Sequence, residues 1–138
     1  MNTYQVEFAP HFSKNLQDLE RCEILESTEY YLNEVIDCSD SEVIVDCLCR
    51  IRLMCSWNHF IENSICDYTF DILFCIIGHP SSDAHKTKYS PEDLAKIMKY
   101  DYALRAYVYS LAMNLDDMVG AKLTIDKKIF LKKAIEFY

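Results

Sequence analysis

Glycine and proline are scarce in this 138-residue chain, which contains two glycines and three prolines. A protein built from many tight β-hairpins is therefore excluded, because the favoured hairpin turns need glycine or asparagine at positive φ. Neither glycine-rich phosphate-binding pattern, G-x-G-x-x-G or G-x-x-x-x-G-K-[ST], can be written in the sequence. Nucleotide binding through those loops is excluded as well.

Positive charge is also in short supply, since 22 acidic residues stand against 14 lysines and arginines and give a formal net charge of −8. Residues 7–46 contain eleven acidic side chains and only two basic ones, Lys14 and Arg21. Because phosphate contacts need clustered cations, we expect no nucleic-acid partner. Four lysines near the C-terminus are interpreted as the solvated face of a last helix: Lys127, Lys128, Lys132 and Lys133.

The seven cysteines form neither a metal-binding nor a disulfide pattern. No C-x2-C pair exists, and the spacing of Cys47, Cys49 and Cys55 fits no common zinc site. Their odd number, and the lack of an N-terminal hydrophobic leader, argue against a secreted disulfide scaffold. Buried cysteines that act as small hydrophobes are expected instead. We therefore predict a reduced, intracellular, cytoplasmic protein with no metal and no cofactor.

Residues 57–77 predict one helix whose second half is apolar on nearly every side. One stripe at helical spacing consists of Trp57, Ile61, Ile65, Tyr68, Ile72 and Cys75. Such a helix has to be enclosed by others, which predicts a bundle around a central member. Asp67 and Asp71 interrupt the only run that approaches the ~18 apolar residues of a membrane span, so no transmembrane anchor is expected.

Amphipathic helices are predicted before this segment. The apolar spacing from His11 to about Ile36 indicates one long or two short helices. A capping-box pattern over residues 39–42 predicts a helix start near Asp40. The buried stripe expected for this helix is Ile44, Cys47, Leu48, Ile51 and Cys55. Residues 43–53 also alternate as a strand does, but no other strand is predicted for it to join, so a helix is preferred.

Two more helices are expected after the central one. Gly78 is a natural helix end, and residues 79–89 form the only long loop. Ser90 as N-cap with Pro91 at the first helical position predicts a helix that continues to about Met113. Its expected apolar side is Leu94, Ile97, Met98, Leu104, Val108 and Leu111. After a turn-rich element around residues 114–120, a last helix runs from about Asp126 to Phe137, with Ile125, Ile129, Phe130 and Ile135 facing inward.

No residue set carries a recognisable catalytic signature, so we predict a protein that is not an enzyme. Asp67 and Asp71 lie one turn apart and would suit proton sharing or a cation. A solvated strip, or pairing with a basic residue of a neighbouring helix, is the preferred interpretation. His79 and His85 lack the further ligands that zinc needs. The cluster of tyrosines at positions 100, 102, 107 and 109 is interpreted as packing.

Binding to a partner helix is the function that a small helical protein of this kind suits best. A groove is predicted where the helix that starts near Asp40 meets residues 57–60. Apolar anchors and hydrogen-bond donors for an acidic partner residue come together there. The predicted groove residues are Arg50, Ile51, Arg52, Met54, Trp57, Asn58, His59 and Phe60.

The order of elements over residues 41–138 resembles the B-cell-lymphoma-2 (Bcl-2) family of apoptosis regulators, especially its compact viral members. In that family a central hydrophobic helix opens with an Asn-Trp-Gly-Arg motif, whose arginine pairs with an aspartate of the captured pro-apoptotic helix. Here Ser56-Trp57-Asn58-His59 stands at the comparable place. The tryptophan matches, Asn58 replaces the glycine and His59 replaces the arginine, so the aspartate would be held by His59, or by Arg50 or Arg52 in its place.

The resemblance implies an all-α, Bcl-2-like single domain over residues 1–138, with five to seven helices around residues 57–77. It further implies a viral inhibitor of apoptosis that sequesters the amphipathic BH3 helix of pro-apoptotic partners, and that reaches mitochondria only through them. The alternative is a helical scaffold or oligomerisation module of a larger assembly, in which the same surface forms a homodimer.

Overall fold

A computed structural model of the chain describes residues 7–59, 68–82, 88–113 and 122–138. Within these ranges it contains six α-helices, one short 3-10 helix and no strand, which confirms the predicted all-α class and the number of helices. The α-helices are α1 (Arg21–Asp37), α2 (Ser41–His59), α3 (Tyr68–Ile77), α4 (Pro91–Tyr100), α5 (Tyr102–Ala112) and α6 (Ile125–Phe137).

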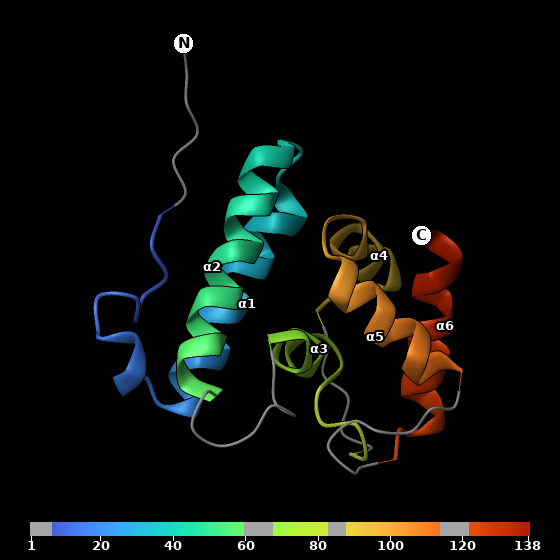
Figure 1. Cartoon of the computed structure of the whole chain (residues 1–138). Coiled ribbons are helices and arrows are strands. Elements are labelled where there is room, and N and C mark those ends of the chain that lie inside the picture. Colours follow the sequence, from blue (N-terminus) through green and yellow to red (C-terminus); the bar gives the residue numbers. More distant parts are fainter. Residues whose placement is uncertain (1–6, 60–67, 83–87, 114–121) are drawn as a thin grey trace. The chain divides into compact units, whose positions relative to one another are not determined.

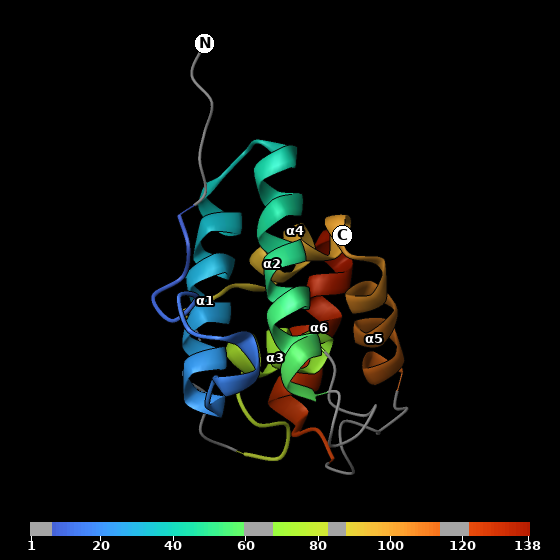
Figure 2. The same ribbon diagram turned by 60° about the vertical axis from the view of Figure 1, so that its left-hand side comes forward.

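The chain forms two compact units, residues 1–72 and residues 73–138. The first unit contains α1, α2 and the first half of α3, and the second contains the rest of α3 together with α4, α5 and α6 (Figure 1, Figure 2). A single domain over residues 1–138 stays a prediction, as does a Bcl-2-like arrangement of the helices. No helix in the described part of the chain is both long enough and apolar enough to cross a membrane.

In the first unit, α1 and α2 lie side by side as an antiparallel pair (Figure 1). Three residues connect them, and a short connection favours this arrangement. Asp40 caps α2, because its Oδ1 accepts the backbone N–H of Glu42 at 2.9 Å. The stripe expected for this helix is confirmed as its buried face. The N-terminal part of the region 11–36 forms only a 3-10 helix at Leu16–Asp18, and α1 begins at Arg21.

The prediction that a helix begins at Trp57 is wrong. Trp57 lies in the last turn of α2, which runs unbroken from Ser41 to His59. No glycine or proline stands between these residues, so nothing in the sequence stops the helix earlier. The predicted continuation through residues 60–67 lies outside the described residues. The apolar second half of the segment forms α3, which ends as predicted at Gly78 with a φ of 74°.

In the second unit, α6 packs against both α4 and α5. Ser90 and Pro91 start α4 as predicted, and the six apolar residues assigned to this stretch are buried. The single helix expected up to Met113 is, however, two helices. Asp101 breaks it, because its extended backbone leaves the helix and its Oδ1 accepts the N–H of Leu104 at 3.0 Å. An N-cap for α5 therefore ends α4.

The inward face predicted for α6 is wrong. Ile125 and Ile129 are exposed, and the buried residues are Lys127, Leu131 and Ala134. These three positions also share one side of a helix, so the pattern of alternating isoleucines and lysines permits either phase. Lys127 was expected on the solvated face. It is instead buried, and its Nζ donates a hydrogen bond to the backbone carbonyl of His79.

Candidate partner-binding site

The residues predicted to form the groove do not share one face of α2. Ile51 and Met54 are fully buried, whereas Arg52 is exposed and Arg50 is half-buried. Because successive residues of a helix are rotated by about 100°, Met54 points away from Arg52. The other four lie at or beyond the end of the helix: Trp57, Asn58 and His59 in its last turn, and Phe60 outside the described residues.

The exposed side of α2 carries an apolar row that was not among the predicted site residues. We call it the α2 face, and it consists of Val45, Cys49 and Leu53. These residues follow one another at intervals of four and so lie on one side of the helix. The side chains of Val45 and Leu53 are 46% and 47% exposed. Helical geometry places Arg52 on one border of the row and Asp46, followed by Arg50, on the other.

Two different contacts hold the arginines. The Arg50 Nε lies 3.0 Å from the Oδ2 of Asp46, one turn earlier on α2. Burial alone lowers the pKa of Arg50, but a hydrogen bond with Tyr31 and the charge of Asp46 outweigh it and raise that pKa above its ordinary value. The guanidinium carbon of Arg52 lies 4.9 Å from the centroid of the Tyr68 ring. Arg52 is thus positioned as a cation beside the α2 face, whereas Arg50 contacts Asp46 and Tyr31.

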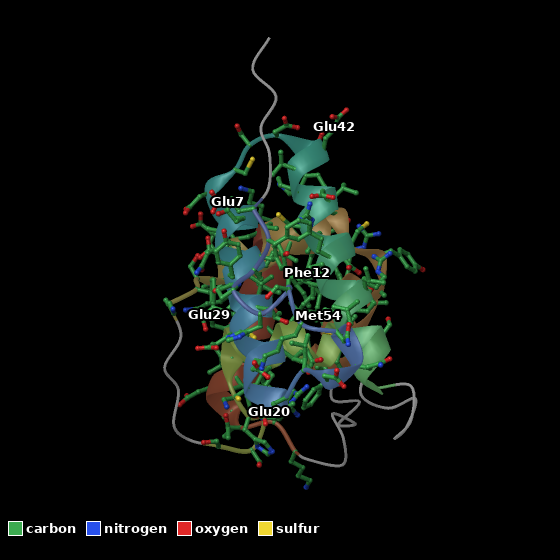
Figure 3. The ribbon with its side chains drawn as sticks, turned by 90° about the vertical axis from the view of Figure 1, so that its left-hand side faces the viewer. Glu7, Phe12, Glu20, Glu29, Glu42 and Met54 are labelled. Atoms are coloured by element: carbon green, nitrogen blue, oxygen red, sulfur yellow. The ribbon has the colours of Figure 1, made fainter. Side chains whose placement is uncertain are left out.

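An N-terminal segment without helix or strand, residues 7–14, lies against α1 and reaches Arg50 on α2; we call it the strap (Figure 3). Its Ala9 N–H donates to the hydroxyl of the fully buried Tyr31 at 3.0 Å. The rings of Phe8 and Phe12 stack with centroids 5.1 Å apart, and Phe12 meets the Tyr31 ring edge-on at 6.4 Å. Phe8 also covers the Arg50 guanidinium at 4.6 Å.

Side-chain contacts with two glutamates hold the rest of the strap on α1. The His11 Nδ1 lies 3.2 Å from Glu23, and its Nε2 lies 2.5 Å from Glu26. The Lys14 ammonium lies 2.5 Å from Glu23. Its hydrogen bond lowers the pKa of Glu23, and the same bond raises the pKa of Lys14. Beside these contacts is a hollow of about 620 Å³ lined by Pro10, His11, Glu26, Glu29, Tyr30 and Asn33.

A buried polar cluster joins α3 to the rest of the first unit. Asp71 is fully buried and pairs with Arg21 at the start of α1, which is one of the two arrangements considered for this carboxylate. The thiol of Cys55 on α2 lies beside Asp71, and burial raises the pKa of that thiol. Burial likewise raises the pKa of Cys47 to about 12. Asp67 lies outside the described residues, so its proximity to Asp71 stays a prediction.

In the part of the chain that the structure describes, no three histidine, cysteine or acidic residues lie close enough together to bind a metal ion. His79 accepts the N–H of Ser81 at 3.3 Å and lies edge-on to Phe74. His85 is not among the described residues. In the tyrosine cluster, Tyr102 is exposed and lies 5.2 Å from the guanidinium carbon of Arg105.

Two signals in the sequence point to what was missed. Phe8 and Phe12 lie four residues apart in a segment with no other large apolar side chain, which indicates that they pack against another part of the protein. Val45 and Leu53 fall outside the buried stripe of α2 and are still apolar, which marks a second apolar side.

Comparison with known proteins identifies no relative: no family model matches the chain, and neither the curated proteins nor the solved structures gave a match.

Proposed function

We propose that this chain is a non-enzymatic binding protein that captures the amphipathic BH3 helix of pro-apoptotic proteins, in the manner of a viral Bcl-2-like inhibitor of apoptosis. The α2 face is the proposed contact surface, with Arg52 at its border. The proposal rests on one structural observation, the exposed apolar row of α2 with the guanidinium group of Arg52 beside it. The resemblance in element order adds the class of partner.

The chemistry of this surface matches an amphipathic helix. Apolar side chains repeat every four residues along Val45, Cys49 and Leu53, which is the spacing that a partner helix presents on its apolar side. A guanidinium binds a carboxylate through charge-assisted hydrogen bonds. We therefore expect the captured helix to carry an acidic residue next to its apolar row, where Arg52 reaches it. Ile51 and Met54, fully buried, support α2 from the core side.

Titration with a panel of helical pro-apoptotic peptides tests the proposal. We expect sub-micromolar binding to at least one peptide. Leu53→Glu should weaken it by about tenfold or more, because a central apolar contact is replaced by a charge. Ile129→Glu is the matched control, since Ile129 on α6 is 46% exposed and belongs to the other unit. Equal losses in both variants, or no binding by any peptide, would reject the proposal.

A scaffold or oligomerisation module is the second candidate, and the same α2 face favours it. Exposed apolar rows on two copies can pack against each other around a two-fold axis. Sedimentation velocity separates the candidates. The scaffold is supported if the protein forms a stable dimer that Val45→Glu dissociates and if no peptide of the panel binds. A monomer that binds a peptide supports capture of the partner helix.

A further inference from the structure

We propose that the surface beneath the strap is a second, separate binding site, which the strap occupies in the free protein. Its external partner is a segment that carries two aromatic residues four positions apart, followed by a cation. The strap itself provides this pattern through Phe8, Phe12 and Lys14. The site uses α1 and the Arg50 side of α2, so it is distinct from the α2 face and does not rest on the function proposed for that face.

Tyr31 and Arg50 form the apolar and main-chain part of the site. The Tyr31 hydroxyl accepts a backbone N–H, and its ring receives the edge of the second aromatic residue. The Arg50 guanidinium receives the face of the first aromatic residue. Its Nη1 is buried and has no hydrogen-bond acceptor among the described residues, so an incoming segment can add a carbonyl oxygen that the strap does not supply.

Glu23 and Glu26 form the charged part of the site. They hold His11 and Lys14 of the strap, and both carboxylates come from one side of α1. The hollow beside the strap continues this surface past Glu29. The hollow lies beside Pro10 and His11, so a partner with a basic side chain at this point would place it near Glu26 and Glu29. Charge complementarity therefore specifies a basic aromatic segment rather than an acidic one.

The strap is held in a way that permits displacement. It contains no helix or strand in residues 7–14, and Phe8 is 65% exposed although it covers Arg50. The side chains of Lys14 and Glu26 in its ion pairs are more than half exposed, so solvent screens these contacts. By contrast, the apolar stripe between α1 and α2 is fully buried. Loss of the strap contacts should leave this helix pair in place.

The test uses the full chain and a fluorescent peptide of residues 7–16, measured by anisotropy. In the variant Phe8→Ala with Phe12→Ala the tethered strap can no longer fill the aromatic positions. We expect this variant to bind the peptide about tenfold or more tightly than the wild-type chain, where the tethered strap competes at a high effective concentration. Phe137→Ala, which removes a half-exposed phenylalanine from α6, should behave as wild type.

Three controls test whether the binding depends on the phenylalanines, on Glu23 and on the α2 face. A peptide with alanine at both phenylalanines should not bind, and Glu23→Gln in the double variant should weaken binding. Leu53→Glu in the double variant should leave it unchanged, which separates this site from the α2 face. Absence of binding to the folded double variant, verified by circular dichroism, overturns the proposal. So does equal binding to wild type and variant. If the double variant does not fold, the same measurement is made with Phe8→Ala alone, and the same two results overturn the proposal.

Discussion

Asp71 of α3 is fully buried, and Arg21, the first residue of α1, pairs with it. The two residues are fifty positions apart, so the contact fixes the beginning of α3 against the beginning of α1. A carboxylate with no exposed surface is costly unless a cation and hydrogen bonds compensate for lost water. The Arg21 side chain is 42% exposed and therefore keeps part of its hydration.

Arg21→Ala should destabilise the protein by about 3 kcal/mol, because it leaves the Asp71 charge buried without its cation. Because Arg21 is partly exposed, we expect a destabilisation at the lower end of the range found when one partner of a buried ion pair is removed. The free energy of unfolding in urea measures it. Arg105→Ala is the control, since Arg105 lies against the rings of the exposed Tyr102 and Tyr138 in the second unit. An effect of Arg21→Ala no larger than that of the control would contradict the structural role of the pair.

Asp101→Ala should destabilise the second unit by about 1 kcal/mol, because α5 loses the side chain that caps it. Asp101→Asn should retain most of that stability, since asparagine caps a helix nearly as well. Urea unfolding of the two variants provides the comparison. If the alanine and asparagine variants lose the same free energy of unfolding, the charge or the burial of Asp101 stabilises the unit and the helix cap does not.

Lys127→Met should destabilise the protein by about 2 kcal/mol, because the carbonyl of His79 loses its buried donor while the aliphatic stem is kept. Lys132→Met on the exposed side of α6 is the control and should change stability by less than about 0.5 kcal/mol. A small effect in both would show that Lys127 reaches solvent.

Stability should fall in acid partly through Glu23. Its pKa is below the ordinary value of 4.5, first because Lys14 donates a hydrogen bond to it, so its contribution is present above that value and is lost as the pH falls through the lowered pKa. Lys14 has a raised pKa, so its contribution is present below 10.5 and is lost as the pH rises through the raised pKa. Glu23→Gln should flatten the acid side of the urea-midpoint profile. Glu136→Gln should not, and an unchanged profile in both variants would refute the contribution of Glu23.

Local chemistry in the sequence was sufficient to locate most helices. Ser90 with Pro91, Gly78 and Asp40 mark helix ends through side-chain or backbone properties that act within a few residues. The break at Asp101 was missed because the apolar pattern continues across it from Met98 to Leu104. Here a single cap overrides a periodicity that remains intact.

Contacts between residues that are far apart in the chain could not be predicted from the sequence. The phase of α6 depends on whether the Lys127 ammonium finds an acceptor, and His79 is 48 residues away. The contacts of the strap were not predicted, because nothing local indicates that Phe8 meets Arg50. For the groove, sequence reasoning selected Arg50 and Arg52, of which Arg52 is exposed and Arg50 is half-buried. It also selected Ile51, which belongs to the buried stripe predicted for α2, and Met54, which is buried as well.

Protection of Cys49 from alkylation tests the central proposal most directly, because this thiol lies within the α2 face and is exposed. Cys22 on α1 is the exposed control, and Cys47, whose pKa burial raises to about 12, should stay unmodified throughout. A saturating pro-apoptotic peptide should slow the modification of Cys49 by about tenfold or more and leave Cys22 unchanged. Cys49 that reacts at its original rate in the presence of every peptide of the panel would contradict capture of a helix on this face.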